Sequence, residues 1–590
     1  MTAARNSVAE SFEDDLLAEL FQFADGGSSK LRHSATLPDS WVARCSALIE
    51  QSGVAQQIAD WRGQDRKTSG PGGRPASLND HTVLVLLTIL AFEHSPLMVT
   101  RMTELLCHRL SEKAKQTLGI AIAPASDQDW YDRLWRATRS LLKVIDPFPG
   151  PRHRQLTRQE FSTVKASRDP VETAEKQKRL DEVCNQLVEV SLCMVPREVR
   201  RRWRGNACID ATLVPAFGKR GTVKRSDYVS IEPDAAWYVR EGDHREVTAE
   251  GRRAPKKVMW GWEATFAVQA TNDPARVPDF PLLVAGIAFG KPGHDVSGHA
   301  IKTFQSIIER GHPAGYAVAD RAYFPNSRAE LLQLPMRALG YGLVFDYQSD
   351  QLGVSDSHAG SIQVEGDWYC PSMPQPLIDA TIDYRNAKTI DEATWRQRIE
   401  QRGQYALRRK ERPDSDGHVP MRCPAAGPSA TVSCPLKPLT QDKQGSTRIF
   451  ITPTHPDRIC TNTASVSFPP SAGAKWAQAL RYGSPEWQAT YSTARNTVEG
   501  YNGYIKDSSR EALSDSSRRR IRGYAAQYLL VTFLVLAANA RKIAAFYDAE
   551  RKAADTTVAG VKRSRPRRRD RLADFTTPAA DTVPDDPPAA

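Results

Sequence analysis

Four polar residues between positions 491 and 506 have the types and the spacing of a site that acts on phosphate groups. They are Tyr491, Arg495, Glu499 and Lys506, separated by steps of four, four and seven residues. If the segment is helical, at about 100° per residue, all four side chains lie within about 80° of arc. Such a face presents one carboxylate among hydrogen-bond donors, which suits phosphodiester cutting beside a bound metal. A solvated helix face with spaced ion pairs is the simpler alternative for this stretch alone.

Two aspartates far upstream favour the chemical interpretation. Asp210 follows the apolar start of ACIDAT, and Asp320 ends the apolar run in GYAVADRAYF. Taken singly, each is typical of a turn or cap at the end of a strand. Together with Glu499 they form an ordered set of three acids from three distant segments. Carboxylate oxygens are the ligands that a hard divalent cation such as Mg²⁺ prefers.

This ordered set resembles that of the DDE transposases of bacterial insertion sequences, in the class with a Y-R-E-K signature around its glutamate. The resemblance covers roughly residues 200 to 545 and implies a ribonuclease H-like catalytic domain. It implies two bound Mg²⁺ ions, for which Mn²⁺ can substitute. The implied catalytic and metal-binding acids are Asp210, Asp320 and Glu499.

The other signature residues are implied to bind DNA phosphates. Arg495 and Lys506 would neutralise phosphate charge near the cut, and Tyr491 would donate a hydrogen bond to one phosphate. Arg321, next to Asp320, would orient the site or pair with a carboxylate of the core. Two residues separate tyrosine and arginine in the signature, whereas three separate them here, so Tyr491 departs from the family pattern.

The implied activity is DNA transposition, a form of DNA recombination that combines an endonuclease step with strand transfer. The chain would bind the terminal inverted repeats of an insertion sequence, pair two ends as a homodimer and join them to target DNA. Two alternatives stay open: an inactive, transposase-derived DNA-binding protein, and a metal-dependent nuclease on the same fold. The implied location is the bacterial cytoplasm, in association with the nucleoid.

Composition agrees with a nucleic-acid partner. The 590 residues exceed what one hydrophobic core usually serves. The net charge is +11 and the pI is about 9.1, which suits a polyanion, although part of the excess lies in a basic C-terminal tail. Residues 524–540 form the one membrane-like run. Because this run contains Gln527, Thr532 and Asn539, we expect a buried helix and no membrane partner.

The strands and helices that must position the acids follow a recognisable order. Three strands, a helix, a strand, a helix and a strand are expected at 207–214, 262–270, 281–289, 297–310, 315–319, 326–334 and 339–347. This order predicts an α/β fold with a ribonuclease H-like mixed sheet, in which the first and fourth strands are neighbours. Asp210 and Asp320 would then converge at one sheet edge. Residues 217–257 show little apolar periodicity and are expected to form a loop.

A long segment separates the second acid from the third. Residues 350–473 are rich in Pro, Gly, Ser and Thr with short β-prone runs, which indicates an inserted β-rich domain. The resemblance supports this insertion and implies that it grips DNA and supports a flipped base during hairpin formation. Its four cysteines could hold a structural zinc ion, but their irregular spacing without a CxxC pair favours unpaired thiols. They are Cys370, Cys423, Cys434 and Cys460.

The helical patterns before the core indicate either a compact DNA-end-binding module or a bundle that only packs on the core. The resemblance favours the first. The chain therefore divides into a mixed N-terminal segment and linker (1–75), a helical region (76–200), the first part of the catalytic core (201–349), the insertion (350–473), the second part of the core with the Y-R-E-K helix (474–546) and a disordered basic tail (547–590).

Overall fold

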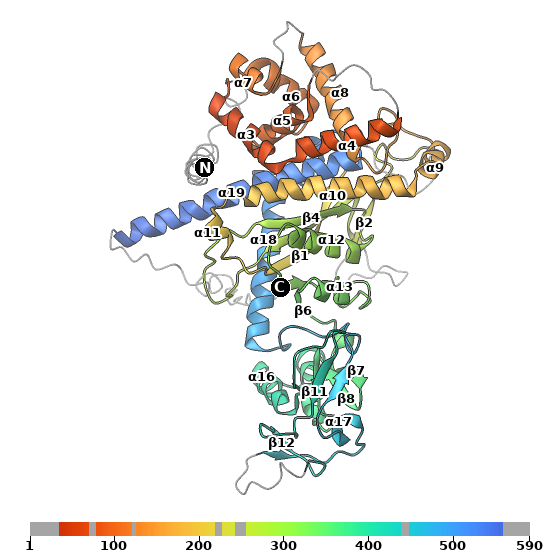
Figure 1. Ribbon diagram of the computed structural model, residues 1–590, viewed down its shortest axis with the longest axis vertical. Helices are drawn as coiled ribbons and strands as arrows, with labels where there is room; N and C mark the ends of the chain where they lie inside the picture. The colour runs from red at the N-terminus through yellow and green to blue at the C-terminus, as the bar shows by residue number, and fades with distance from the viewer. Residues whose placement is uncertain are drawn as a thin grey trace, which may run out of the picture.

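The protein is a mixed α/β structure whose parts follow one another along a long axis (Figure 1). Helices form one end, a six-stranded mixed sheet lies in the middle, and a lobe of small sheets and short helices forms the other end. The computed structural model describes residues 35–69, 78–120, 126–218, 227–241, 255–437 and 448–558. The α/β class predicted from the sequence is confirmed.

The helical end begins with six helices: α3 (Asp39–Ser52), α4 (Val54–Ser69), α5 (Asp80–Phe92), α6 (Val99–Glu104), α7 (Glu112–Thr117) and α8 (Asp127–Ile145). The last four lie in the region 76–200 that was predicted to be helical. Helices α3 and α4 correct the prediction, because they lie in residues 1–75, which were expected to form a mixed segment and linker. Helix α4 packs against its neighbours α3, α5 and α8, and this tertiary packing outweighs the low helix propensity of Gly63.

The central sheet has the strand order β2-β3-β1-β5-β6, with β4 also paired to β3. Its strands are β1 (Ala207–Pro215), β2 (Ala236–Glu241), β3 (Pro255–Gln269), β4 (Val284–Gly290), β5 (Tyr316–Ala319) and β6 (Gly342–Phe345). Strand β1 runs antiparallel to β3 and parallel to β5, and β5 runs parallel to β6. The predicted neighbourhood of the first and fourth core strands is therefore confirmed.

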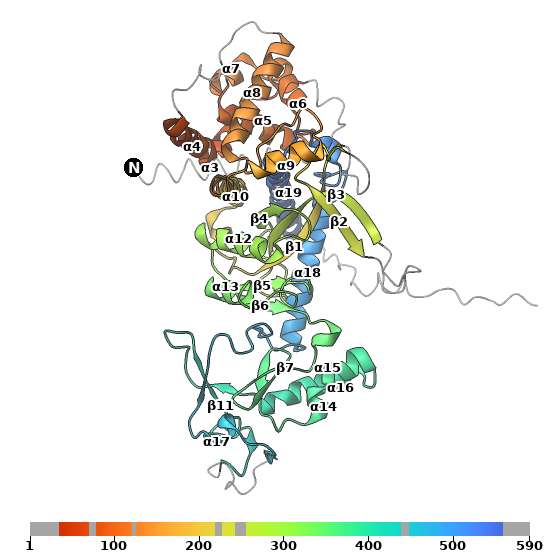
Figure 2. The ribbon, with the colours of Figure 1, turned by 90° about the vertical axis from the view of Figure 1, so that its right-hand side faces the viewer.

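Helices cover both faces of this sheet (Figure 2). One face contacts α18 (Pro485–Lys506) and the other contacts α12 (Val296–Glu309), while α10 (Pro170–Leu192) and α19 (Tyr524–Val558) pack against the edge strand β4. The approach of α12 is close, since a Cβ atom on Gly286 would lie 2.8 Å from the Thr303 carbonyl oxygen. On the opposite face Phe266 packs edge-on against Tyr501 of α18, with ring centroids 6.3 Å apart.

Two predictions around the sheet were wrong. The segment expected as a loop contains β2 and the first three residues of β3, and these two strands pair as an antiparallel ribbon. Trp237 and Trp260 pack edge-on across it with centroids 5.3 Å apart, a cross-strand pair that stabilises a ribbon. The helix expected over 326–334 instead forms later, as α13 (Gln333–Ala338). Pro335 then lies in the first turn, where a missing N–H costs little.

Helix α19 is the one helix in the described ranges that is long and apolar enough to cross a membrane, and most of its apolar window is buried in the protein. Its polar residues bind β4, an edge strand. The Asn539 amide donates to the Val284 carbonyl at 3.0 Å and accepts from the Val284 N–H at 3.0 Å. Asn185 of α10 does the same for Ile287. Side-chain amides thus satisfy the outward backbone groups that an edge strand would leave unpaired.

Replacement of Asn539 by leucine is expected to destabilise the core by about 3 to 4 kcal/mol. The change would leave both Val284 backbone groups and the Tyr501 hydroxyl without a buried partner, and Ser191 would keep only its bond to the Val188 carbonyl. Thermal unfolding measures the loss. Thr532→Val is the matched control on the same helix, because Thr532 bonds the carbonyl one turn back and the Cys184 thiol but no backbone group of β4, and the change should cost less than about 1 kcal/mol. Equal effects of the two changes would contradict this role.

The chain leaves the sheet after β6 and returns to it at α18, and the lobe lies between them. Its strands are β7 (Val354–His358), β8 (Ser361–Val364), β9 (Asp367–Tyr369), β10 (Arg408–Arg409), β11 (Val419–Arg422), β12 (Val432–Ser433), β13 (Ile449–Phe450) and β14 (Val466–Phe468). Short helices that were not predicted join them: α14 (Gln375–Ile378), α15 (Ala380–Ile382), α16 (Glu392–Gln401) and α17 (Arg458–Thr461). The tail predicted to begin at 547 is also corrected, since α19 continues through Val558; residues 559–590 lie outside the described ranges.

Candidate functional site

The three acids predicted from the sequence come from three elements of the central part and face one another. Asp210 lies within β1, on the sheet face that α18 covers, because the Asn502 amide of α18 donates to it at 2.9 Å. Asp320 directly follows β5, the parallel neighbour of β1. Glu499 lies on α18. The adjacency of two strands and one crossing helix thus brings together residues that are far apart in the sequence.

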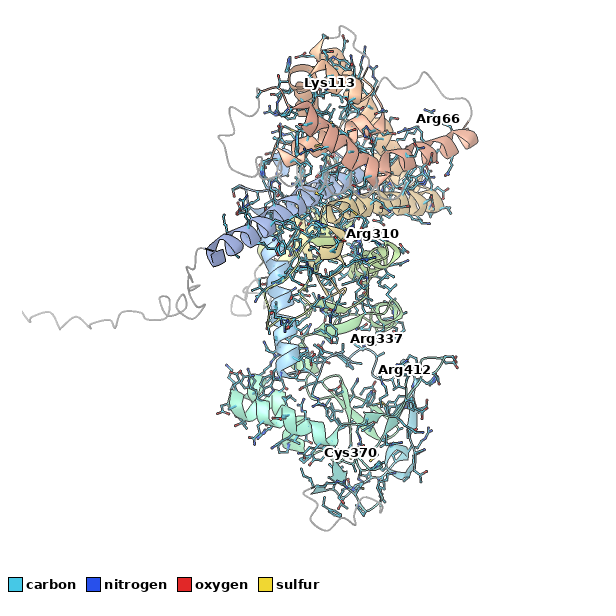
Figure 3. All side chains as sticks on the ribbon, turned by 60° about the vertical axis from the view of Figure 1, so that its left-hand side comes forward. Arg66, Lys113, Arg310, Arg337, Cys370 and Arg412 are labelled. Carbon is cyan, nitrogen blue, oxygen red and sulfur yellow. The ribbon has the colours of Figure 1, made fainter. Side chains whose placement is uncertain are left out.

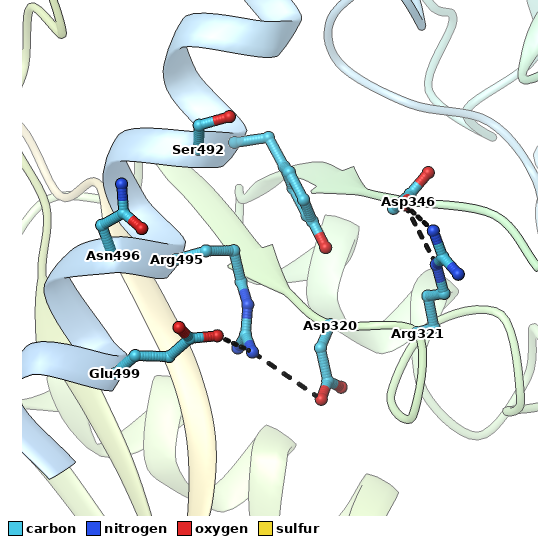
Figure 4. A pocket seen from close by; sticks show the side chains of 8 residues that line it. Asp320, Arg321, Asp346, Ser492, Arg495, Asn496 and Glu499 are labelled. Carbon is cyan, nitrogen blue, oxygen red and sulfur yellow. Dashed lines mark hydrogen bonds and ion pairs between the residues drawn. The ribbon is translucent and has the colours of Figure 1, made fainter. Parts of the chain in front are cut away.

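A single guanidinium, that of Arg495, lies among the three carboxylates, and Figure 4 shows it between Glu499 and Asp320. Its Nη2 donates to Glu499 Oε1 at 2.9 Å, the i,i+4 pair that the helical spacing predicts. The same nitrogen lies 4.0 Å from Asp320 Oδ2, and Nη1 lies 3.9 Å from Asp210 Oδ1. Buried Nη1 has no hydrogen-bond partner. Arg495 therefore occupies the position at which a cation neutralises all three acids.

Burial and neighbouring charges shift the pKa of Asp210, the acid that lies deepest. Burial raises the pKa of Asp210 to about 6; Arg495 lowers it, and the neighbouring Asp320 carboxylate raises it. Burial alone would lower the pKa of the Arg495 guanidinium, but Asp210 and Asp320 outweigh burial and raise it. Three ionised carboxylates and one guanidinium leave a formal charge of −2. The site is thus short of positive charge at neutral pH.

Asp210→Asn is expected to stabilise the metal-free protein at neutral pH. The folded-state pKa of about 6 lies above the ordinary value of 3.8, so ionised Asp210 costs stability above about pH 6, and this cost disappears as the pH falls towards about 4. One pKa unit corresponds to about 1.4 kcal/mol, so the gain at about pH 7 should be on the order of 1 to 3 kcal/mol. Thermal unfolding in chelator measures it, and an equal gain at about pH 4 would contradict the assignment.

A pocket of about 440 Å³ opens beside the acids. Its lining combines carboxylates with donors, the chemistry expected where a phosphodiester and a cation meet. The lining residues are Asp320, Arg321, Asp346, Tyr491, Ser492, Arg495, Asn496 and Glu499. Five of the seven predicted site residues therefore line one pocket, and Asp210 adjoins it through Arg495.

Arg321 pairs with a carboxylate of the core, one of the two roles predicted for it. Its Nε donates to Asp346 Oδ2 at 3.0 Å. Arg385, from the lobe, donates to Asp346 Oδ1 at 2.7 Å, and the Tyr482 hydroxyl donates to the same oxygen. Burial would raise the pKa of Asp346, but Arg385 and the other donors hold it below its ordinary value. Asp346 thus ties the pocket wall to the lobe.

Tyr491 and Lys506 differ in their relation to the pocket. Tyr491 lines it and stacks on Trp487, with ring centroids 5.1 Å apart and an interplanar angle of 7°. Burial raises the pKa of its hydroxyl, so Tyr491 is a neutral donor at physiological pH. Lys506 is the last residue of α18, about 10 Å along the helix axis from Glu499. It does not belong to the pocket lining.

Ser492 and Asn496 line the pocket and were not predicted; Asp346 and Asn502 were not predicted either, although each has a signal in the sequence. Asp346 directly follows β6 as Asp320 follows β5, and Ala319 pairs with Phe345 in the parallel register. Asn502 lies three residues after Glu499, on the same face of α18. A search for every polar residue at a strand end or on the signature face would have identified both.

The chemistry of these side chains fits divalent cations. The three carboxylates supply hard oxygen ligands, and the net negative charge and raised pKa of Asp210 indicate room for more positive charge. In the described part of the chain no three His, Cys, Asp or Glu side chains already surround one point as metal ligands. At this site Arg495 lies between them, so metal binding requires that its guanidinium move aside.

No protein-family model, curated protein or solved structure matches this chain.

Proposed function

We propose that the protein is a DDE-type transposase of the Y-R-E-K class that cuts and joins DNA at the ends of an insertion sequence. The observation that carries this proposal is the convergence of Asp210, Asp320 and Glu499 around Arg495. Three acids that share a single neighbouring cation are typical of a catalytic metal site rather than of a stabilising network.

The strand order supports a ribonuclease H-like core. Without β2, the strands lie across the sheet in the order β4-β3-β1-β5-β6. Numbered by their order along the chain, these are the third, second, first, fourth and fifth core strands. The second strand is antiparallel to the first, and the fourth and fifth are parallel to it. In this arrangement the first and fourth strands each contribute one acid, and a later helix contributes the third.

Each site residue has a role in this chemistry. Asp210, the deepest acid, would bridge two Mg²⁺ ions, and Asp320 and Glu499 would each hold one. When bound, such ions activate a water and stabilise the leaving oxygen. Arg495 would turn its forked donors from the acids to a DNA phosphate, and Tyr491 would donate a hydrogen bond at the pocket wall.

The remaining parts would hold the DNA. The net charge of +11 favours a polyanionic partner. The helical end is assigned to the terminal repeats, and the lobe, linked to the pocket through Arg385 and Asp346, to DNA beside the cut. Lys506, beyond the pocket, is assigned to phosphates further along the duplex. A homodimer that pairs two ends in the bacterial nucleoid completes the proposal.

The proposal is tested with a labelled duplex that carries the inverted repeats flanking the gene. Wild-type protein and Asp210→Asn are incubated with it in Mg²⁺, Mn²⁺ or chelator. Metal-dependent nicking at the repeat boundary that is lost in the variant is the expected result. Pre-cut ends with free 3′-hydroxyls are then supplied with target DNA, and their joining is expected.

Two outcomes would replace the proposal by another function. Specific binding without cutting in any metal would indicate a DNA-binding protein derived from such an enzyme. Cutting without joining of pre-cut ends would indicate a metal-dependent nuclease, because strand transfer is the step that separates the two activities.

A further inference from the structure

The lobe between β6 and α18 contains little regular structure for its size. Strands β10, β12 and β13 have two residues each, and β14 has three. Ladders this short contribute few hydrogen bonds and are not stable by themselves. Most of its buried apolar residues belong to three small clusters, and only those near its two ends, such as Leu352 and Leu480, pack with the main core. A unit of this kind usually needs a covalent or metal staple.

Four of the nine cysteines of the chain lie in this lobe. All four are buried and none forms a disulfide. Cys370, which Figure 3 places in the lobe, packs in one apolar cluster with Cys423 and Cys434. Cys460 belongs to a second apolar cluster of the lobe. Four segments that are far apart in the sequence thus each bring one thiol into the interior of the lobe.

Three of these cysteines occupy the same local structure. Each is followed by proline, in CPSM, CPAA and CPLK, and each carbonyl accepts a hydrogen bond from the N–H three residues later. The donor–acceptor distances are 3.0 Å for Cys370, 3.0 Å for Cys423 and 2.9 Å for Cys434. Proline after the cysteine fixes φ for such a turn. The repetition of one turn at three separate cysteines indicates a shared task for their side chains.

The turns direct backbone donors at the sulfurs. Burial raises the pKa of Cys370 to about 12, and a hydrogen bond from the Ser372 N–H opposes this rise. Burial likewise raises the pKa of Cys423, and the Ala425 N–H, again two residues after the cysteine, opposes it. An N–H that donates to sulfur favours the thiolate, the form that binds metals.

The four thiols also lie close enough to influence one another. Besides burial, the charges of Cys423 and Cys460 raise the pKa of Cys370. Cys434 and Cys460 likewise raise the pKa of Cys423, and Cys434 raises that of Cys460. The ammonium of Lys437, at the end of the third turn, lowers the pKa of both Cys423 and Cys460.

We propose that Cys370, Cys423, Cys434 and Cys460 bind one structural Zn²⁺ ion that holds the lobe together. Zinc favours four thiolates in a tetrahedron, and thiolate is a softer ligand than any group of the acidic site. Binding releases the thiol protons and leaves a formal charge of −2 on the complex, which Lys437 partly offsets. The described thiols do not yet surround one point, so binding includes rotation of the cysteine side chains. This inference does not depend on the proposed function.

The test is the metal content of the purified full chain, measured by plasma mass spectrometry after dialysis. About one zinc per chain is expected, released when a mercurial reagent titrates the cysteines. The pair Cys423→Ser with Cys434→Ser should lose the zinc. Cys107→Ser is the matched control, because Cys107 lies in the helical end and should leave the zinc in place. Asp210→Asn should also keep it, which separates this ion from ions at the acidic site.

A second measurement covers the case in which the serine variants fail to fold. Zinc is removed from the wild-type chain by the mercurial reagent, and limited proteolysis is followed before and after. Faster cleavage within residues 350–473, with the helical end unaffected, is expected. The proposal is overturned if zinc-supplied protein contains less than about a tenth of an equivalent. It is overturned as well if the double variant keeps its zinc, if Cys107→Ser loses it, or if the four cysteines are found as disulfides.

Discussion

Glu499→Ala is expected to reduce metal-dependent cutting by about 10³-fold or more while leaving DNA binding within about twofold of wild type. The change removes one of three metal ligands, and metal ions supply several kcal/mol of transition-state stabilisation in such sites. The side chain is 59 % exposed, so its loss should not affect folding. Initial cleavage rates in Mg²⁺ and a gel-shift titration of the same duplex measure the two effects.

Glu486→Ala provides the matched control for this experiment. Glu486 lies in the first turn of the same helix and is exposed, but it does not line the pocket. Cutting by this variant should equal that of wild type. Normal cutting by Glu499→Ala would remove Glu499 from the site, whereas equal losses in both variants would show that the helix and not the carboxylate had been damaged.

Arg495→Ala is expected to have the second large effect, and it should appear in two measurements. Without the guanidinium, three carboxylates face one another with no cation, and the pKa of Asp210, which Arg495 lowers, should rise further. We expect the metal-free protein to lose on the order of 1 to 3 kcal/mol, less than for a fully buried pair because Asp320 and Glu499 reach solvent. Cutting should fall by about 10²-fold through loss of a phosphate donor.

The metal dependence of stability distinguishes this role from simple packing. Mg²⁺ should raise the melting temperature of Arg495→Ala more than that of wild type, because the ion no longer competes with a resident cation. Arg495→Lys keeps the charge but loses the forked donors. It should recover the metal-free stability more than the cutting rate. If Arg495→Ala matches wild type in chelator and responds equally to Mg²⁺, Arg495 does not neutralise the acids.

Several features of the protein were decided by local sequence. The four-residue spacing of Arg495 and Glu499 required their contact once the segment was helical, and the i,i+4 bond is present. The apolar runs around Asp210 and before Asp320 predicted two strands, and β1 and β5 form there, although β1 continues past Asp210 to Pro215. These predictions succeed because helical and extended periodicity are properties of short segments.

Other features depended on long-range packing and could not be predicted. The resemblance assigned Arg495 to phosphates, but the fold directs it at three acids, because β1, β5 and α18 meet around it. Asp346 became part of the pocket wall through the register of β5 with β6 and through Arg385 of the lobe. Periodicity within a segment does not determine which segments become neighbours.

The cysteines of the lobe show the same division between local and tertiary information. Three Cys-Pro pairs are visible in the sequence, and each predicts a turn by itself. Their irregular spacing concealed that these turns and Cys460 approach one another. Only the path of the chain through the lobe brings Cys370, Cys423 and Cys434 into one apolar cluster. The sequence by itself determined the chemical groups and their local geometry, whereas tertiary structure decided which groups meet, because burial and strand register act between segments that are distant along the chain.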